Sequence, residues 1–356
     1  MHRRLLTVFF SLLLVTVFGF AVFKAESNIP VDRLYALHLS QAPTDSEWAR
    51  ALPRLIETRG GKKNERSRLG DIDADTVHTS TASCHHGSSL PDPIIVDMRA
   101  FYTDQELFLR LEWRDATKDD AMNQWTFDGT VWSSAASFED GFGLMWDARG
   151  SFPRFNCSYA CHISDFGVSA DNFHARNKMK MARPDTTLDL WNWKAGRTGQ
   201  LGFVDDRLID EKGIRGDLPG ELFRPNSLYF NAGSSRQPFT QGDAPLIDAA
   251  GDSIEAVFRM AGSTVPGYLT DRPVGSRADI SAFSRHEEGR WIVVLSRKLN
   301  TGDPKDVVFL PGDESGVAFG LSLMDNTLIE HFASGSEERL VLMPRDITVV
   351  QGEEYK

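Results

Sequence analysis

The chain has 356 residues, enough for one large domain or two ordinary ones, and 41% of them are hydrophobic. Lys and Arg number 39 against 50 Asp and Glu, which gives a formal net charge of −11. This composition excludes a disordered chain and a polytopic membrane protein. It also does not suit a nucleic-acid binder, because phosphate neutralisation requires clustered basic side chains.

Residues 1–25 are typical of a signal peptide or an N-terminal membrane anchor. Arg3 and Arg4 precede an apolar run from Leu5 to Phe23, which is the layout of an export signal. The run is just long enough to span a bilayer, and no clean small-x-small cleavage site follows it, so both alternatives stay open. In either case we expect the body of the protein in the periplasm, or on the extracytoplasmic side of the inner membrane.

Residues 26–75 are interpreted as a polar N-terminal extension, with a short helix within residues 46–55 and a solvated loop at residues 60–68. Residues 76–350 are assigned to one domain. Its first strong signal is a hairpin of residues 94–102 and 106–114, because side chains in the second arm alternate with the period of a half-buried strand.

Further short apolar segments are separated by Gly, Asp and Pro. We predict strands at residues 141–146, 253–260, 291–296, 307–310, 317–324 and 340–343. Many short strands with intervening turns predict a mainly β fold, an antiparallel β-sandwich or barrel. The chain shows neither βαβ alternation nor a Gly-rich phosphate loop, so a dinucleotide-binding fold is not indicated. Residues 148–250 are interpreted as a loop-rich, partly helical insertion, and such insertions usually carry function.

The insertion contains the sequence CSYACH at residues 157–162. Two cysteines followed directly by histidine form the attachment pattern of c-type haem. The thiols of Cys157 and Cys161 would add to the porphyrin vinyl groups, and His162 would be the proximal iron ligand. The spacer has three residues, where two are usual. A Cys157–Cys161 disulfide and a zinc site with scattered ligands are the alternatives.

Residues 80–86, STASCHH, repeat this layout with Ser80 in place of the first cysteine. Either Cys84 carries a second haem through a single thioether, with His85 as its iron ligand, or His85 or His86 serves as a distal ligand. A free thiol beside exposed histidines is the alternative. The sequence therefore predicts one haem c and leaves open a second.

A haem iron held by histidine needs either a sixth ligand, for electron transfer, or an open face, for ligand chemistry. The available donors are His174, Met179, Met181, Lys194 and His331. We rank His331 first, because it follows an apolar strand and a turn, Met181 second and Lys194 last. Spacing alone does not decide between them.

Five stretches of the chain carry a resemblance to a known family. They are MRAFYTDQELFLRLEWRDAT (98–117), GLMWDARGSFPRFNCSYACH (143–162), DLWNWKAGRTGQLGFVDD (189–206), GRWIVVLSRKL (289–299) and VAFGLSLMDNTLIEH (317–331). These stretches resemble the haem-binding domain of ethylbenzene dehydrogenase and of related dimethyl sulfoxide reductase-type gamma subunits, including c-type cytochrome members.

The resemblance implies a β-sandwich with a haem at one end, a role in electron transfer, and a molybdenum-enzyme-type complex as partner. Gamma subunits of that family hold a b-type haem through Met and Lys, so His162 would replace one of these ligands here. Lys194 lies in one of the matching stretches. Arg197, Asp205 and Asp206 are expected to tie the loop together through salt bridges or to bind the haem propionates.

We therefore predict an exported c-type cytochrome that transfers single electrons in a respiratory or redox chain to a protein partner, and not a catalytic enzyme. The alternative is an extracytoplasmic β-sandwich binding module, or a redox-enzyme subunit, with a Cys157–Cys161 disulfide and no haem. An enzyme using five-coordinate haem ranks third, because no paired carboxylates or nucleophile–base arrangement stands out.

Overall fold

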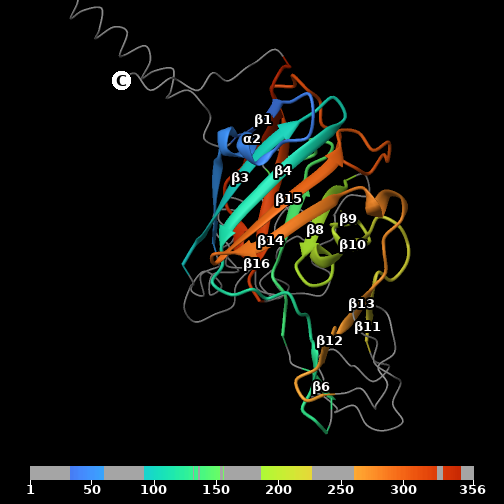
Figure 1. Cartoon of the computed structure of the whole chain (residues 1–356). Helices are drawn as coiled ribbons and strands as arrows, with labels where there is room; N and C mark the ends of the chain where they lie inside the picture. The colour runs from blue at the N-terminus through green and yellow to red at the C-terminus, as the bar shows by residue number, and fades with distance from the viewer. Residues whose placement is uncertain are drawn as a thin grey trace, which may run out of the picture.

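The computed structural model describes residues 33–59, 92–130, 132–134, 137–152, 155, 186–226, 260–326 and 332–345. Within these ranges the protein consists mainly of β-strands (Figure 1). No helix in this described part is both long and apolar enough to cross a membrane. The segment 1–25, predicted as a signal peptide or anchor, lies outside the described residues.

Thirteen strands form the main sheet. They are β1 (Arg33–His38), β2 (Arg54–Arg59), β3 (Ile94–Tyr102), β4 (Glu106–Arg114), β7 (Gly141–Trp146), β8 (Leu188–Lys194), β9 (Asp205–Asp210), β10 (Gly213–Gly216), β14 (Ser281–Glu287), β15 (Arg290–Lys298), β16 (Val317–Met324), β17 (Phe332–Ser334) and β18 (Glu338–Leu342). The order β10-β9-β8-β7-β16-β17-β2-β3-β4-β15-β14 is antiparallel throughout, while β1 runs parallel to its neighbours β3 and β18.

The sheet folds over into two layers with the core between them. Trp146 of β7 and Trp191 of β8 belong to the same buried cluster as Leu111 of β4, Val293 of β15 and Phe319 of β16. Successive side chains of a strand point to opposite faces, so every second residue enters this core. Each such side chain contributes about 1.5–3 kcal/mol through burial. The prediction of an antiparallel β-sandwich is confirmed.

The other face of the β7–β8–β9 layer is apolar as well. Met145 of β7 and Leu190 of β8 form a second buried cluster with Phe152 and Phe155, which follow β7. The two phenylalanine rings lie 5.3 Å apart between their centres. Phe155 is the last residue described before residue 186, so the segment that contains the CSYACH motif starts on this outer face.

Two smaller sheets extend from one end of the sandwich (Figure 1). One contains β5 (Trp125–Phe127), β6 (Trp132–Ser134) and β12 (Thr264–Val265), and the other pairs β11 (Phe223–Pro225) with β13 (Tyr268–Thr270). Helix α2 (Asp45–Arg50) begins after Thr44, whose N–H donates to the Glu47 carboxylate at 2.6 Å. It ends before Leu52-Pro53, because a residue that precedes proline disfavours helical backbone.

The strands predicted at 94–102, 106–114, 141–146 and 317–324 are confirmed with the same bounds, and those at 291–296 and 340–343 overlap β15 and β18. The predicted strand at residues 307–310 is wrong. The N–H of Val307 donates to the Asp189 side chain and its carbonyl accepts from Arg297, so these groups do not enter a strand ladder. Residues 253–259 lie outside the described part.

Two boundaries of the domain differ from the sequence interpretation. β1 and β2 lie in the segment interpreted as an N-terminal extension, yet both are strands of the main sheet. Their residues Leu34, Ala36 and Ile56 are fully buried. The sequence shows no clean alternation there, because the apolar residues Leu37 and Leu55 stand next to Ala36 and Ile56. Likewise β8, β9 and β10 lie within the 148–250 insertion and continue the sheet. The described part of that insertion contains a single 3₁₀ turn, Gly199–Leu201, in place of the expected helix.

Candidate functional site

Most of the predicted site residues lie outside the described part of the chain. These are Cys84, His85, Cys157, Cys161, His162, His174, Met179, Met181 and His331. Their predicted roles therefore stay predictions. Lys194, Arg197, Asp205 and Asp206 are described, and they lie on β8, β9 and the turn between them.

Lys194 is the last residue of β8 and its side chain is buried on the outer face, because Trp191 and Trp193 on the same strand face the core. Its Nζ donates to Asp205 Oδ2 at 3.0 Å and lies 4.9 Å from the centre of the Phe223 ring. Burial lowers the pKa of Lys194 to about 7, although the charge of Asp205 opposes the change. A large fraction of this amine is therefore neutral near pH 7, and a neutral amine has a lone pair that can bind a metal.

Asp205 is the counter-charge for several cations at this face. Besides Lys194, it accepts from Arg277 Nε at 2.9 Å, and Arg207 Nε lies 3.8 Å away. Burial alone would raise the pKa of Asp205, but the charges of Lys194, Arg207 and Arg277 lower it overall. The prediction that Asp205 forms salt bridges is confirmed.

The turn after β8 is fixed by a buried carboxylate. Glu139 accepts hydrogen bonds from the backbone N–H of Gly196 and of Arg197, both at 2.8 Å, and it also pairs with the Arg197 guanidinium. That guanidinium lies 4.7 Å from the ring centre of Phe223 and 5.4 Å from that of Tyr268. The turn requires glycine at position 196, since a Cβ there would lie 2.5 Å from the Asp120 carbonyl oxygen.

A pocket of about 140 Å³ opens beside Arg197, between the sandwich and the smaller sheets. Met122, Gln200, Pro266 and Tyr268 are among its lining residues. Pockets for drug-sized ligands measure about 300–1,000 Å³, so this space does not hold a porphyrin by itself. The Met122 thioether is a haem-ligand type that the sequence analysis passed over, because a single methionine in a loop forms no pattern.

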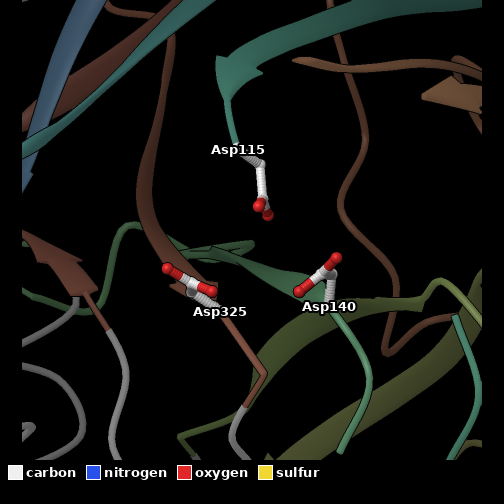
Figure 2. Close-up of side chains that lie close together, drawn as sticks. All are labelled: Asp115, Asp140 and Asp325. Carbon is white, nitrogen blue, oxygen red and sulfur yellow. The ribbon is translucent and has the colours of Figure 1, made fainter. Parts of the chain in front are cut away.

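Three carboxyl groups meet at the same end of the sandwich. Figure 2 shows Asp115, Asp140 and Asp325 pointing toward one another, and their oxygens lie within 4.8 Å. Burial raises the pKa of Asp140 to about 7. Both Asp140 oxygens already accept protein hydrogen bonds, from the N–H of Asp119 and of Asn326 and from the Trp291 indole. Asp140 thus ties together the chain segments that close this end.

Asp206 differs from its neighbour Asp205. It faces the interior of the sandwich, and neither of its carboxylate oxygens has a hydrogen-bond partner among the described residues. The salt bridge expected for Asp206 is therefore not formed there. Arg197, in contrast, forms the expected ion pair, with Glu139.

Fold and site together define a class of protein: an antiparallel β-sandwich with a buried amine and a set of buried ion pairs on the outer face of β8 and β9. The sequence also matches the family model described as ethylbenzene dehydrogenase, over residues 45–327. The match covers more than half of the chain, and the protein belongs to this family. At a coarse level the family places the chain among redox enzymes and their associated subunits.

No curated protein matches the chain. Two solved structures that align with it are family 9 carbohydrate-binding modules from Caldicellulosiruptor kristjanssonii. The complex with cellotriose is 7% identical, covers 91% of this chain and 100% of its own, and has a TM-score of 0.34. The complex with glucose is 6% identical, with coverages of 88% and 98% and a TM-score of 0.34.

Proposed function

We propose that the protein is an exported c-type cytochrome that passes single electrons to or from a redox enzyme, as a partner or subunit of a molybdenum-enzyme-type complex. The observation that carries the proposal is the CSYACH motif at residues 157–162, inside a family match that spans residues 45–327. Cys157 and Cys161 would hold the haem covalently, and His162 would bind its iron. When bound, the haem supplies a one-electron iron couple.

The outer face of β7 and β8 supports this assignment. One residue, Asn156, separates Phe155, which packs on this face, from the first cysteine of the motif. Lys194 lies on the same face, four residues along β8 from Leu190 in the Phe155 cluster. The chain thus enters the motif from the face of β8 on which Lys194 lies. Lys194, ranked last from sequence, becomes a stronger sixth-ligand candidate beside His331 and Met181.

The groups around Lys194 favour binding of its amine to the haem iron. Burial favours the amine without its extra proton, which is the form that binds iron. Asp205 holds the side chain in place, and it keeps Arg277 as a partner if the amine turns toward a metal. The aromatic ring of Phe223 covers the site and limits access of water.

The test is the full-length protein produced in a host that matures c-type cytochromes. We expect a haem absorbance that survives acid–acetone extraction, and an intact mass that reports one or two haems and the state of residues 1–25. The Cys157→Ser/Cys161→Ser variant should lose the covalent haem, whereas Cys84→Ser keeps at least one. A colourless protein whose 157–161 peptide carries a disulfide would refute the proposal and favour the alternative, a binding module or redox-enzyme subunit without haem.

The sixth ligand is tested separately, by carbon monoxide binding to the reduced protein. The wild type is expected to bind it poorly, because a second side chain would occupy the position on the iron that carbon monoxide needs. Among Lys194→Ala, His331→Ala and Met181→Ala, the substitution that removes the ligand should open the iron to carbon monoxide. Strong binding by the wild type would instead indicate a five-coordinate haem and contradict electron transfer by a six-coordinate carrier.

A further inference from the structure

A second group of charged residues lies between the two layers of the sandwich, away from Lys194. Carboxylate oxygens of Asp189, Asp206 and Asp306 lie within 4.8 Å of one another, and all three residues are buried. Asp189 is the second residue of β8 and faces the interior, Asp206 lies on β9, and Asp306 is in the loop between β15 and β16. Three separate parts of the chain therefore bring acidic groups to one interior point.

One cation faces this group in the described structure. Arg297 of β15 is 1% exposed, and its Nη2 lies 2.8 Å from Asp306 Oδ2 and 3.4 Å from Asp189 Oδ2. Three ionised carboxylates and one guanidinium leave a charge of −2. This is the charge that one divalent cation neutralises.

Some carboxylate oxygens of this group lack hydrogen-bond partners, and a bound cation would supply the missing contacts. Both oxygens of Asp206 and Oδ1 of Asp189 are buried and have no hydrogen-bond partner in the described part of the chain. Asp206 is 0% exposed. A buried carboxylate without a partner costs several kcal/mol, so native proteins pair such groups, protonate them or use them to bind metals.

We propose that Asp189, Asp206 and Asp306 bind a divalent cation of the calcium type, which fastens the β15–β16 loop to β8 and β9. Carboxylate oxygens are hard ligands suited to calcium, which accepts irregular geometry, whereas magnesium retains most of its water and fits a dry site poorly. No His or Cys belongs to the group, so a zinc site is not indicated by the described residues.

Further acidic residues lie beside this group. Asp306 also belongs to a second acidic group with Asp217 and Asp303, and Asp303 is partly exposed. The acidic side chains therefore extend from the interior toward the surface at Asp303. The proposal does not depend on the haem, since none of these residues belongs to the Lys194 face.

The experiment uses the full-length protein, first dialysed against EGTA and then supplied with calcium or magnesium chloride. We expect one calcium retained per chain after gel filtration, measured by mass spectrometry of the metal. The melting temperature should rise by about 5 °C in 1 mM calcium relative to EGTA, and less in magnesium.

Asp206→Asn and Asp189→Asn should lose both the retained metal and the melting shift. Asp206→Asn should still fold in EGTA at least as stably as the wild type, because an amide needs no counter-charge. Asp325→Asn, in the other acidic group, is the matched control and should keep the full response. The proposal is overturned if calcium changes neither metal content nor melting temperature, which would mean that protons neutralise the group. A calcium response that survives Asp206→Asn and disappears in Asp325→Asn would also overturn it.

Discussion

Replacing Lys194 by methionine should remove a specific pH dependence of stability. Methionine keeps an unbranched apolar stem and lacks the ammonium group, so the variant has no proton to release at this position. In the wild type, burial lowers the lysine pKa from 10.5 to about 7. Between these pH values the unfolded chain binds more protons than the folded protein, so the free energy of unfolding rises with pH.

The size of the effect follows from the two pKa values. Integrating the proton-linkage relation from pH 7 to pH 9.5 gives a gain of about 3 kcal/mol for the wild type. The buried aspartates with raised pKa values, among them Asp140 and Asp217, act in the opposite direction. Because they are present in both proteins, the difference between wild type and Lys194→Met isolates the lysine.

The assay is urea unfolding of the full-length protein at pH 7 and pH 9.5, with the midpoint and slope fitted at each pH. Lys118→Met, at a half-exposed lysine that pairs with Asp120, should follow the wild type. If iron binds the amine, the lysine stays deprotonated below pH 7 as well, and the difference extends to lower pH. Parallel pH dependence in wild type and Lys194→Met would refute the reasoning.

Three further predictions concern the same end of the sandwich. Glu139→Gln should lower the free energy of unfolding by about 2–4 kcal/mol, because the partly buried Arg197 loses its counter-charge; a change in thermal melting below about 2 °C would contradict this. Gly267→Ala should cost about 1–3 kcal/mol in urea unfolding, because a Cβ there lies 2.0 Å from the Asn123 carbonyl oxygen, whereas Gly335→Ala, with open space, should change little. Asp140→Asn should reduce the loss of stability that the wild type shows as the pH rises from about 4 to 7, since folded Asp140 keeps its proton longer than the unfolded chain, while Asp217 maintains part of the loss. Unfolding curves at pH 5 and 8 test this, and an equal loss in both proteins would contradict it.

The sequence identifies strands well where only one face is buried. Leu109, Leu111 and Trp113 enter the core while Arg110 and Glu112 between them are partly exposed, and β4 has the predicted bounds, 106–114. In β8 nearly every side chain is buried, since Trp191 faces the core and Leu190 packs under Phe155. A strand covered on both faces lacks the alternating pattern, which is why the segment was interpreted as part of an insertion.

Part of the candidate site could be predicted from contiguous residues, and part depends on contacts between residues far apart in the sequence. The CSYACH motif is contiguous, so the sequence alone predicts its chemistry. The environment of Lys194 depends on Arg277, which is 72 residues from its partner Asp205, and the turn at Arg197 depends on Glu139, 58 residues away. No local pattern encodes such pairs, because the folding of the sheet brings them together.

Asp205 and Asp206 show how the sheet itself separates two kinds of chemistry. They are consecutive residues of β9, so their side chains emerge on opposite faces. On the outer face Asp205 meets Lys194, Arg207 and Arg277, and its pKa is lowered. On the inner face burial and the charge of Asp189 raise the pKa of Asp206 well above its ordinary value. Asp205 is therefore a stable anion that positions the buried amine. Asp206, one residue later, is an acid that needs a cation or a proton. Because a layer of backbone lies between them, a protein of this kind can hold a metal ion in its interior without removing the counter-charge of Lys194.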